Sequence, residues 1–177
     1  MTVVTKFPTT VVDSASAWTT PDNVKLDDAT CASITLASAV TRTLVCSVYG
    51  FEIPVGSIIT QIRIFIDADV SRVVSVDDRY ITFSLKKTGG TTYIIQSTNY
   101  AAPPTCAKAT KDYYILPAGA LTVAQLNAES FTTCIDAVLL DTQSTSFFCD
   151  CVGIEVTYTE PPTGRKYFGD GLTWRVS

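Results

Sequence analysis

The sequence predicts an all-β protein, an antiparallel β-sandwich of about eight to nine strands with one short helical turn and an extended C-terminal tail. Three observations predict this fold class. Short segments alternate apolar and polar residues, as half-buried strands do. Corners rich in proline and glycine separate these segments. The chain of 177 residues is long enough for one full hydrophobic core and too short for two.

The elements are expected in a simple order. Residues 1–17 form an edge strand or an arm that crosses to a neighbour, and strands follow at residues 30–36, 43–48, 58–70, 79–87, 91–97, 112–116, 131–139 and 146–159. Gly89 and Gly90 predict a hairpin turn. Residues 121–127 form the helical turn, with Thr122 as its N-cap. The sandwich domain therefore spans residues 18–159, and residues 160–177 form the tail.

The last strand carries the clearest alternation. Strict alternation places Phe148, Asp150, Val152, Ile154, Val156 and Tyr158 on the core face, and Phe147, Cys149, Cys151, Gly153, Glu155 and Thr157 on the other. A carboxylate on the core face needs a partner. Asp150 is therefore expected to bind the backbone of a loop, with a catalytic role as the alternative.

Six cysteines are candidates for disulfides: Cys31, Cys46, Cys106, Cys134, Cys149 and Cys151. They are either reduced and buried, or oxidised after the protein leaves a reducing cytoplasm. If residues 131–139 and 146–158 pair as a hairpin, Cys134 lies opposite Cys151 or, in a shifted register, Cys149. The remaining thiol would meet Cys106 or a neighbouring subunit. Cys31 and Cys46 fall on opposite faces, so a bridge between them needs a β-bulge.

Composition narrows the possible functions. The sequence has no histidine, which excludes Ser–His and Cys–His nucleophile pairs. The net charge of −4 argues against nucleic acid as the main partner. No apolar run of about 18 residues occurs, so no membrane-spanning helix is expected. The N-terminus lacks a signal-peptide pattern, which predicts a protein made in a cytoplasm and kept there or released by another route. No cofactor is expected.

Acidic and aromatic residues offer two further hypotheses. Asp67, Asp69, Asp77 and Asp78 flank one loop and are weak candidates for a calcium site; the alternative is a solvated acidic loop. Asp27 and Asp28 are interpreted as turn residues. Five tyrosines in or near strands are candidates for a sugar-binding platform or, alternatively, for core packing: Tyr49, Tyr93, Tyr100, Tyr113 and Tyr114.

A series of motifs resembles a known group of proteins. Its parts, in chain order, are Trp18…Pro21-x-Asn23, Asp28, Gly50-Phe51-x-Ile53-Pro54-x-Gly56-x-x-Ile59, Ile62-x-Ile64-x-Ile66, Leu121-Thr-x-x-x-Leu126-Asn127…Phe131 and Asp150-x-Val152-x-Ile154-x-Val156-x-Tyr158. Over residues 18–158 the chain resembles the jelly-roll-like β-sandwich domains of tailed-bacteriophage virion structural proteins. The six cysteines and the tail at residues 165–177 depart from that pattern.

The resemblance implies a non-enzymatic structural component of a phage particle, located in the virion: a head-decoration, neck or collar, or tail accessory protein. Its partners would be other virion proteins and copies of itself, with disulfides as possible staples. The tail is expected to contact a neighbouring subunit through Arg165, Lys166, Tyr167, Phe168, Leu172, Trp174 and Arg175. The alternative function is a carbohydrate-binding or host-adhesion module.

Overall fold

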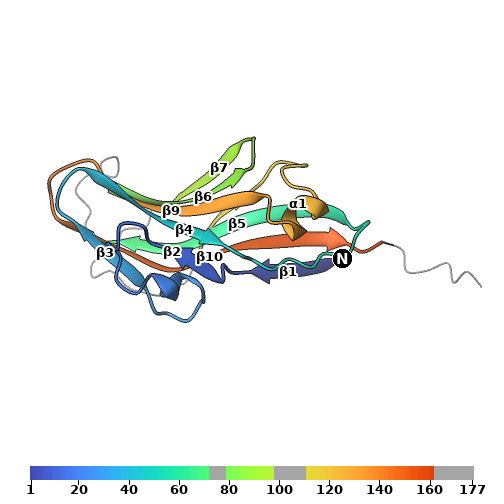
Figure 1. Ribbon diagram of the computed structural model, residues 1–177, viewed down its shortest axis with the longest axis horizontal. Helices are drawn as coiled ribbons and strands as arrows, with labels where there is room; N and C mark the ends of the chain where they lie inside the picture. The colour runs from blue at the N-terminus through green and yellow to red at the C-terminus, as the bar shows by residue number, and fades with distance from the viewer. Residues whose placement is uncertain (72–78, 98–110, 162–177) are drawn as a thin grey trace, which may run out of the picture.

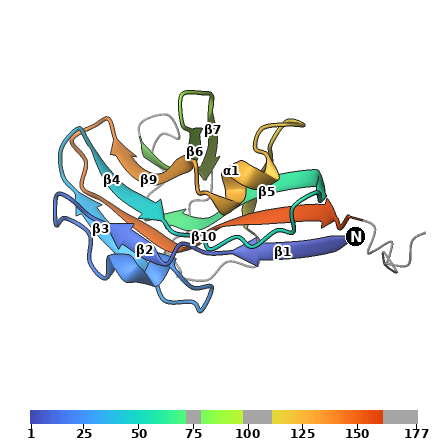
Figure 2. The same cartoon turned by 45° about the vertical axis from the view of Figure 1, so that its right-hand side comes forward.

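Two antiparallel sheets pack face to face in the computed structural model, which describes residues 1–71, 79–97 and 111–161 (Figure 1). Sheet A contains β1 (Thr2–Lys6), β10 (Thr145–Thr159), β5 (Ile58–Val70) and β8 (Asp112–Ile115) in that order, with β3 (Ala32–Leu36) also paired to β10. Sheet B has the order β2 (Thr10–Val12), β4 (Val40–Ser47), β9 (Phe131–Leu139), β6 (Arg79–Lys87) and β7 (Thr92–Ser97). The turned view in Figure 2 shows the two layers. The predicted all-β sandwich is confirmed.

Two short helices connect the strands. The 3-10 helix η1 spans Pro21–Val24, and α1 spans Val123–Asn127. The predicted N-cap of α1 is confirmed, because Thr122 Oγ1 accepts a hydrogen bond from the Gln125 amide at 3.2 Å. The Gln125 side chain accepts in return from the Thr122 amide at 3.0 Å, which completes a capping box. No helix in the described ranges is long and apolar enough to cross a membrane.

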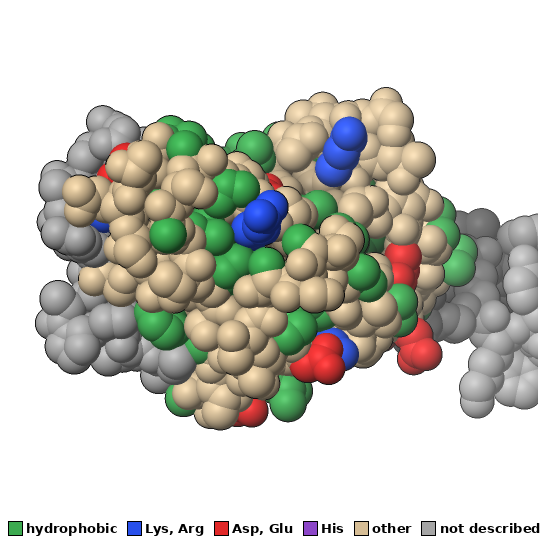
Figure 3. Space-filling view, turned by 60° about the vertical axis from the view of Figure 1, so that its left-hand side comes forward, with side chains coloured by type: hydrophobic (Ala, Val, Ile, Leu, Met, Phe, Trp, Pro, Cys, Tyr) green, Lys and Arg blue, Asp and Glu red, His purple; other side chains and the backbone are tan. Residues whose placement is uncertain are grey.

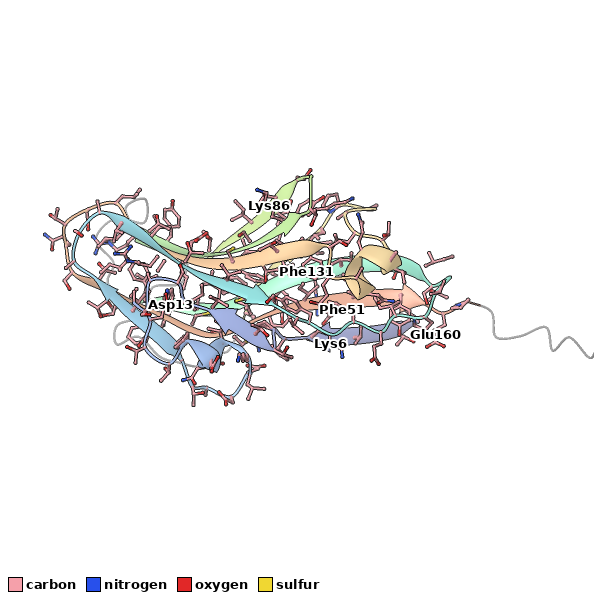
Figure 4. The ribbon with its side chains drawn as sticks, viewed as in Figure 1. Lys6, Asp13, Phe51, Lys86, Phe131 and Glu160 are labelled. Carbon is pink, nitrogen blue, oxygen red and sulfur yellow. The ribbon has the colours of Figure 1, made fainter. Side chains whose placement is uncertain are left out.

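The core lies between the sheets. Its largest fully buried apolar side chains come from both layers and include Leu44, Phe83 and Ile135 of sheet B and Ile64, Phe147 and Ile154 of sheet A. Phe51 and Phe131, which are labelled in Figure 4, both pack their rings against Tyr49. The buried Tyr49 hydroxyl lies 2.7 Å from Thr133 Oγ1. Tyr49 is therefore a core residue and does not contribute to a sugar-binding platform.

β10 is the central strand of sheet A. It pairs along most of its length with β5 on one side, from Phe147 opposite Val70 to Thr159 opposite Ile58. On its other side, β3 pairs with the first half of β10 and β1 with the second half. Residues 1–17 thus supply edge strands to both sheets, since β2 pairs with β4. The edge-strand alternative holds for this segment.

The predicted alternation of the last strand is wrong in its first half. A β-bulge interrupts the pairing with β5 between Cys149 and Cys151, and Asp150 is the additional residue. One additional residue moves the side chains before it to the opposite face. Phe147 and Cys149 therefore belong to the core, whereas Phe148 is only partly buried. Val152 to Tyr158 keep the predicted alternation.

The predicted hairpin between residues 131–139 and 146–158 is also wrong. β9 and β10 belong to different sheets, so the chain between them crosses from sheet B to sheet A. Cys134 lies opposite Val45 of β4 and Ser84 of β6. Arg79 supports the crossing, because its guanidinium pairs with Asp141 and donates to Thr145 Oγ1 at 3.2 Å.

Candidate binding face on sheet A

The outer face of sheet A, turned away from the core, carries the most varied chemistry of the described residues. Along β5 this face presents Arg63, Phe65 and Asp67, because these side chains alternate with the core residues Ile64 and Ile66. The register places Glu155, Gly153 and Cys151 of β10 beside those three residues. Tyr113 and Ile115 of β8 extend the rows on the other side. The face therefore has an ion pair, an aromatic row and an acidic cluster.

The aromatic row crosses three segments. Phe65 meets Phe7 edge-on, with ring centroids 5.8 Å apart, and meets Tyr113 at 5.9 Å. The Phe65 ring lies against the backbone of β10, because the residue beside it on that strand is Gly153. A Cβ atom at Gly153 would lie 2.3 Å from Phe65 Cζ and 3.0 Å from the Lys6 carbonyl oxygen. Phe65 is 4% exposed, Phe7 is partly buried and Tyr113 is 50% exposed, so Tyr113 is the most exposed ring of this row.

The ion pair lies beside the aromatic row, at the next pair of outward-facing residues of β5 and β10. Arg63 binds Glu155 through two contacts, Nε to Oε1 at 2.6 Å and a terminal nitrogen to Oε2 at 2.9 Å. The hydrogen bond with Glu155 raises the pKa of Arg63. The guanidinium carbon also lies 4.6 Å from the centroid of the Tyr113 ring. Charged and aromatic groups therefore adjoin each other at this position.

The acidic cluster is a product of the bulge in β10. Asp150 and Cys151 are consecutive residues, yet neither belongs to the core between the sheets. The loop between η1 and β3 covers them, held by a β-bridge between Lys25 and Cys151. This loop brings in Asp27. One carboxylate oxygen of Asp27, one of Asp150 and the Cys151 sulfur lie within 4.8 Å of one another.

The electrostatics of the cluster favour neutral forms of its buried groups. Asp150 is 2% exposed, and its Oδ1 has no hydrogen-bond partner among the described residues. Burial raises its pKa to about 6; the backbone amide of Ala29 opposes this, and the charges of Asp67 and Asp27 add to it. Burial also raises the pKa of the Cys151 thiol, with the charge of Asp27 as the next cause. Lys111 Nζ lies 2.7 Å from Asp27 Oδ2.

Asp150 has the loop contact that the sequence suggested, through the backbone amides of Ala29 and Asp28. Its carboxylate, however, lies on the outer face of the sheet and not in the core. Asp28 is a turn residue as interpreted, since its side chain accepts from the Thr30 amide at 3.1 Å. Asp27 lies in the same loop, and its carboxylate joins the acidic cluster.

Four of the cysteines follow the reduced alternative, and the disulfides considered for them do not form. Cys46, Cys134, Cys149 and Cys151 carry free thiols, so neither predicted bridge to Cys134 forms, nor one between Cys31 and Cys46. Burial raises the pKa of Cys46 to about 12 and also raises that of Cys149, which keeps both thiols protonated. Cys31 is disulfide-bonded. Cys106 lies outside the described residues.

Several other predicted site residues are only partly placed. Asp67 and Asp69 are buried on β5, and Asp77 and Asp78 lie outside the described residues. The tail candidates Arg165, Lys166, Tyr167, Phe168, Leu172, Trp174 and Arg175 lie outside them as well, as does Tyr100. Tyr93 packs against the core from β7, and Tyr114 is 41% exposed on β8.

Sequence reasoning singled out Tyr113, Asp150 and Cys151 of this face, but it did not connect them with the other residues that surround them. Phe7, Arg63 and Glu155 come from three strands or their ends, and Asp27 and Lys111 are 84 positions apart. No local spacing connects such residues. The Gly153 position was the one available signal, because a glycine inside a strand often marks a close approach by another group.

No family model and no curated protein matches the sequence. One solved structure with a similar chain is that of TmCBM61 in complex with β-1,4-galactotriose. The match has a TM-score of 0.45 and 10% sequence identity, and it covers 85% of this chain and 88% of that chain.

Proposed function

We propose that the protein is a non-enzymatic structural component of a tailed-phage particle, as a head-decoration, neck or collar, or tail accessory protein, that binds neighbouring virion subunits. The observation that carries the proposal is the β7/β8 edge, defined as Ile94, Tyr113, Tyr114 and Ile115. β7 and β8 are the last strands of their sheets on the same side of the sandwich and contact each other. The proposal also rests on the resemblance of residues 18–158 to virion sandwich domains.

The β7/β8 edge is unusually apolar for a surface. Ile94 is 55% exposed, Ile115 is 59% and Tyr114 is 41%. Among the described strands, β7 pairs only with β6, and β8 only with β5. Open edges with apolar side chains favour the addition of another chain, and burial of those side chains stabilises the complex. The face in Figure 3 shows a few charged side chains among hydrophobic and other ones.

Incorporation into particles tests this proposal. The double variant Ile94→Asp/Ile115→Asp should fold with an unchanged melting temperature, because both side chains face solvent, and should be lost from purified particles. Val55→Asp is the matched control, since Val55 is 89% exposed but lies in the turn before β5. The control should be incorporated like the unmodified protein. Equal incorporation of the double variant would contradict the proposal.

A carbohydrate-binding or host-adhesion module is the second candidate function, and the outer face of sheet A favours it. Tyr113 presents half of its side chain to solvent beside the Arg63–Glu155 pair. Sugars bind to aromatic rings flanked by charged hydrogen-bonding groups of this kind. Screening on a glycan array, with Tyr113→Ala expected to lose binding and Tyr114→Ala to keep it, tests this candidate. No binding to any glycan by the unmodified protein would exclude it.

A further inference from the structure

The acidic cluster beneath the loop between η1 and β3 combines three potential metal ligands from two separate segments. Asp27 comes from the loop, and Asp150 and Cys151 come from the bulge of β10. Their closest donor atoms are within 4.8 Å of one another. Two ligands of one tetrahedral ion with bonds of about 2.0–2.3 Å lie roughly 3.5 Å apart. Small side-chain rotations are therefore enough to bring all three donors onto one ion.

A second observation points to a missing partner at the same position. Asp150 is 2% exposed, and its Oδ1 is buried without a hydrogen-bond partner among the described residues. A buried carboxylate oxygen in this state is costly unless a cation or a donor satisfies it. Most buried polar groups in proteins have such a partner. The unpartnered oxygen belongs to the residue that already lies beside Asp27 and Cys151.

The bulge explains why these two β10 residues can act together. Consecutive residues of a regular strand point to opposite faces of the sheet. The additional residue in β10 leaves both Asp150 and Cys151 outside the core cluster, while Cys149 and Val152 on either side belong to it. Bulges are frequent beside functional sites because they redirect a side chain in this way.

We propose that Asp27, Asp150 and Cys151 bind a divalent metal ion of the zinc class, with the bulge of β10 and the loop between η1 and β3 as the two walls of the site. Two carboxylates and a thiolate suit a borderline ion such as Zn²⁺, which accepts both oxygen and sulfur. Calcium takes oxygen ligands only and would leave the sulfur unused. Binding releases the thiol proton of Cys151 to solvent.

Lys111 fits this arrangement as a supporting residue. Its ammonium group bonds Asp27 Oδ2, which leaves the other oxygen of that carboxylate for the ion. Metal-bound carboxylates are commonly held by a second hydrogen bond that fixes their orientation. The nearby charge of Asp67, which raises the pKa of both Asp150 and Cys151, adds negative potential that attracts a cation.

Metal titration of the full chain tests the site. The protein is first treated with a chelator, and Zn²⁺, Cd²⁺ or Ca²⁺ is then added. We expect one equivalent of Zn²⁺ or Cd²⁺ to bind, to raise the melting temperature and, with Cd²⁺, to produce the ultraviolet thiolate-to-metal charge-transfer band. Binding of Ca²⁺ in preference to Zn²⁺, or no binding above background, would overturn the proposal.

Variants assign the ligands. Cys151→Ser should abolish the Cd²⁺ band, and Asp150→Asn should weaken Zn²⁺ binding by roughly ten-fold or more. Cys134→Ser is the matched control, since it removes a partly buried thiol of sheet B. If a β10 variant does not fold, Asp27→Asn on the exposed loop gives the same test. A band or an affinity that is unchanged in the ligand variants would contradict the assignment.

Discussion

The two halves of β10 differ in how their side chains alternate between the core and the outer face of sheet A. Residues 152–157 pair with β5 without interruption, and alternate side chains from Val152 to Tyr158 enter the core. In residues 145–151, a bulge reverses the alternation and leaves Asp150 and Cys151 on the outer face. The first half pairs with β3 and the second with β1, although both pair with β5 on the other side. One strand thus combines a packing segment with a segment that gathers polar groups.

The difference shows how an irregular strand places two polar groups next to each other on one face of a sheet. In the regular half, outward residues are separated by inward ones, so reactive groups lie at least two positions apart. In the bulged half, a carboxylate and a thiol are adjacent on one face. The irregularity that disturbs the core pattern is therefore what creates the candidate metal site.

The largest expected effect distinguishes the two possible registers of the first half. Phe147→Ala should destabilise the protein by about 3–5 kcal/mol, because Phe147 is fully buried between the sheets. Phe148→Ala should cause a clearly smaller loss, since Phe148 lies on the partly exposed outer face. Urea unfolding of both variants measures the difference. The opposite order would mean that strict alternation holds and that the bulge is absent.

Gly153→Ala probes the regular half and should be the next largest effect, a loss of about 1–3 kcal/mol. The new methyl group would meet both the Phe65 ring and the Lys6 carbonyl oxygen of β1, and the backbone contact cannot simply rotate away. Adding Phe65→Leu should recover part of the loss. Gly90→Ala is the control, because its Cβ would meet only the Lys87 side chain at 3.4 Å or more. Equal effects at the two glycines would show that the aromatic row does not constrain the sheet.

Asp150→Asn should stabilise the chelator-treated protein at neutral pH by about 1–2 kcal/mol, since it removes a buried charge and keeps the side-chain shape. The pKa of this carboxyl is raised from 3.8 to about 6, so the folded state binds its proton more tightly than the unfolded state. The destabilisation is full above pH 6 and is relieved as the pH falls toward 4. Thermal melts of both proteins between pH 4 and 8 should therefore converge at acidic pH. A stabilising gap that widens at low pH would contradict the pKa direction.

The smallest effect is expected at the ion pair of the regular half. Glu155→Gln should cost at most about 1 kcal/mol, because the pair is partly solvent-exposed. The loss should shrink further at high salt, which screens the interaction. Chemical unfolding at low and high ionic strength measures both. A loss that exceeds that of Gly153→Ala would indicate that the ion pair, and not the aromatic row, organises this face.

Local patterns predicted much of the fold, because the residues that determine a strand, a turn or a helix cap lie close together in the sequence. The alternation of residues 58–70, the Gly89-Gly90 turn and the Thr122 cap all led to the observed structures. The bulge in β10 is not indicated by any such local pattern. Phe147 is followed by another phenylalanine, and Cys149 and Cys151 are identical residues, so the apolar pattern fits either register of the strand.

Pairing between elements was harder to predict than the elements. The hairpin considered for residues 131–139 and 146–158 does not form. The connection after Leu139 carries the chain between sheets, with Arg79 bound to Asp141 and Thr145 at the crossing. The acidic cluster depends on the same kind of information. Asp27 and Lys111 meet only because a loop folds over the bulge and β8 pairs with β5. Such contacts follow from tertiary arrangement and have no signature in sequence spacing.

The central position of β10 has a consequence for how the protein folds during its synthesis. β1, β3 and β5 all pair with this strand, yet it is synthesised after every other strand that the structure describes. Until residue 159 has left the ribosome, these three strands lack the neighbour that joins them. Their apolar side chains stay exposed during that time, which favours aggregation or binding to chaperones. Sheet A is therefore completed late, when β10 pairs with β1 through contacts such as Thr2 with Tyr158. A fold with so many distant contacts is expected to form slowly and in one concerted final step.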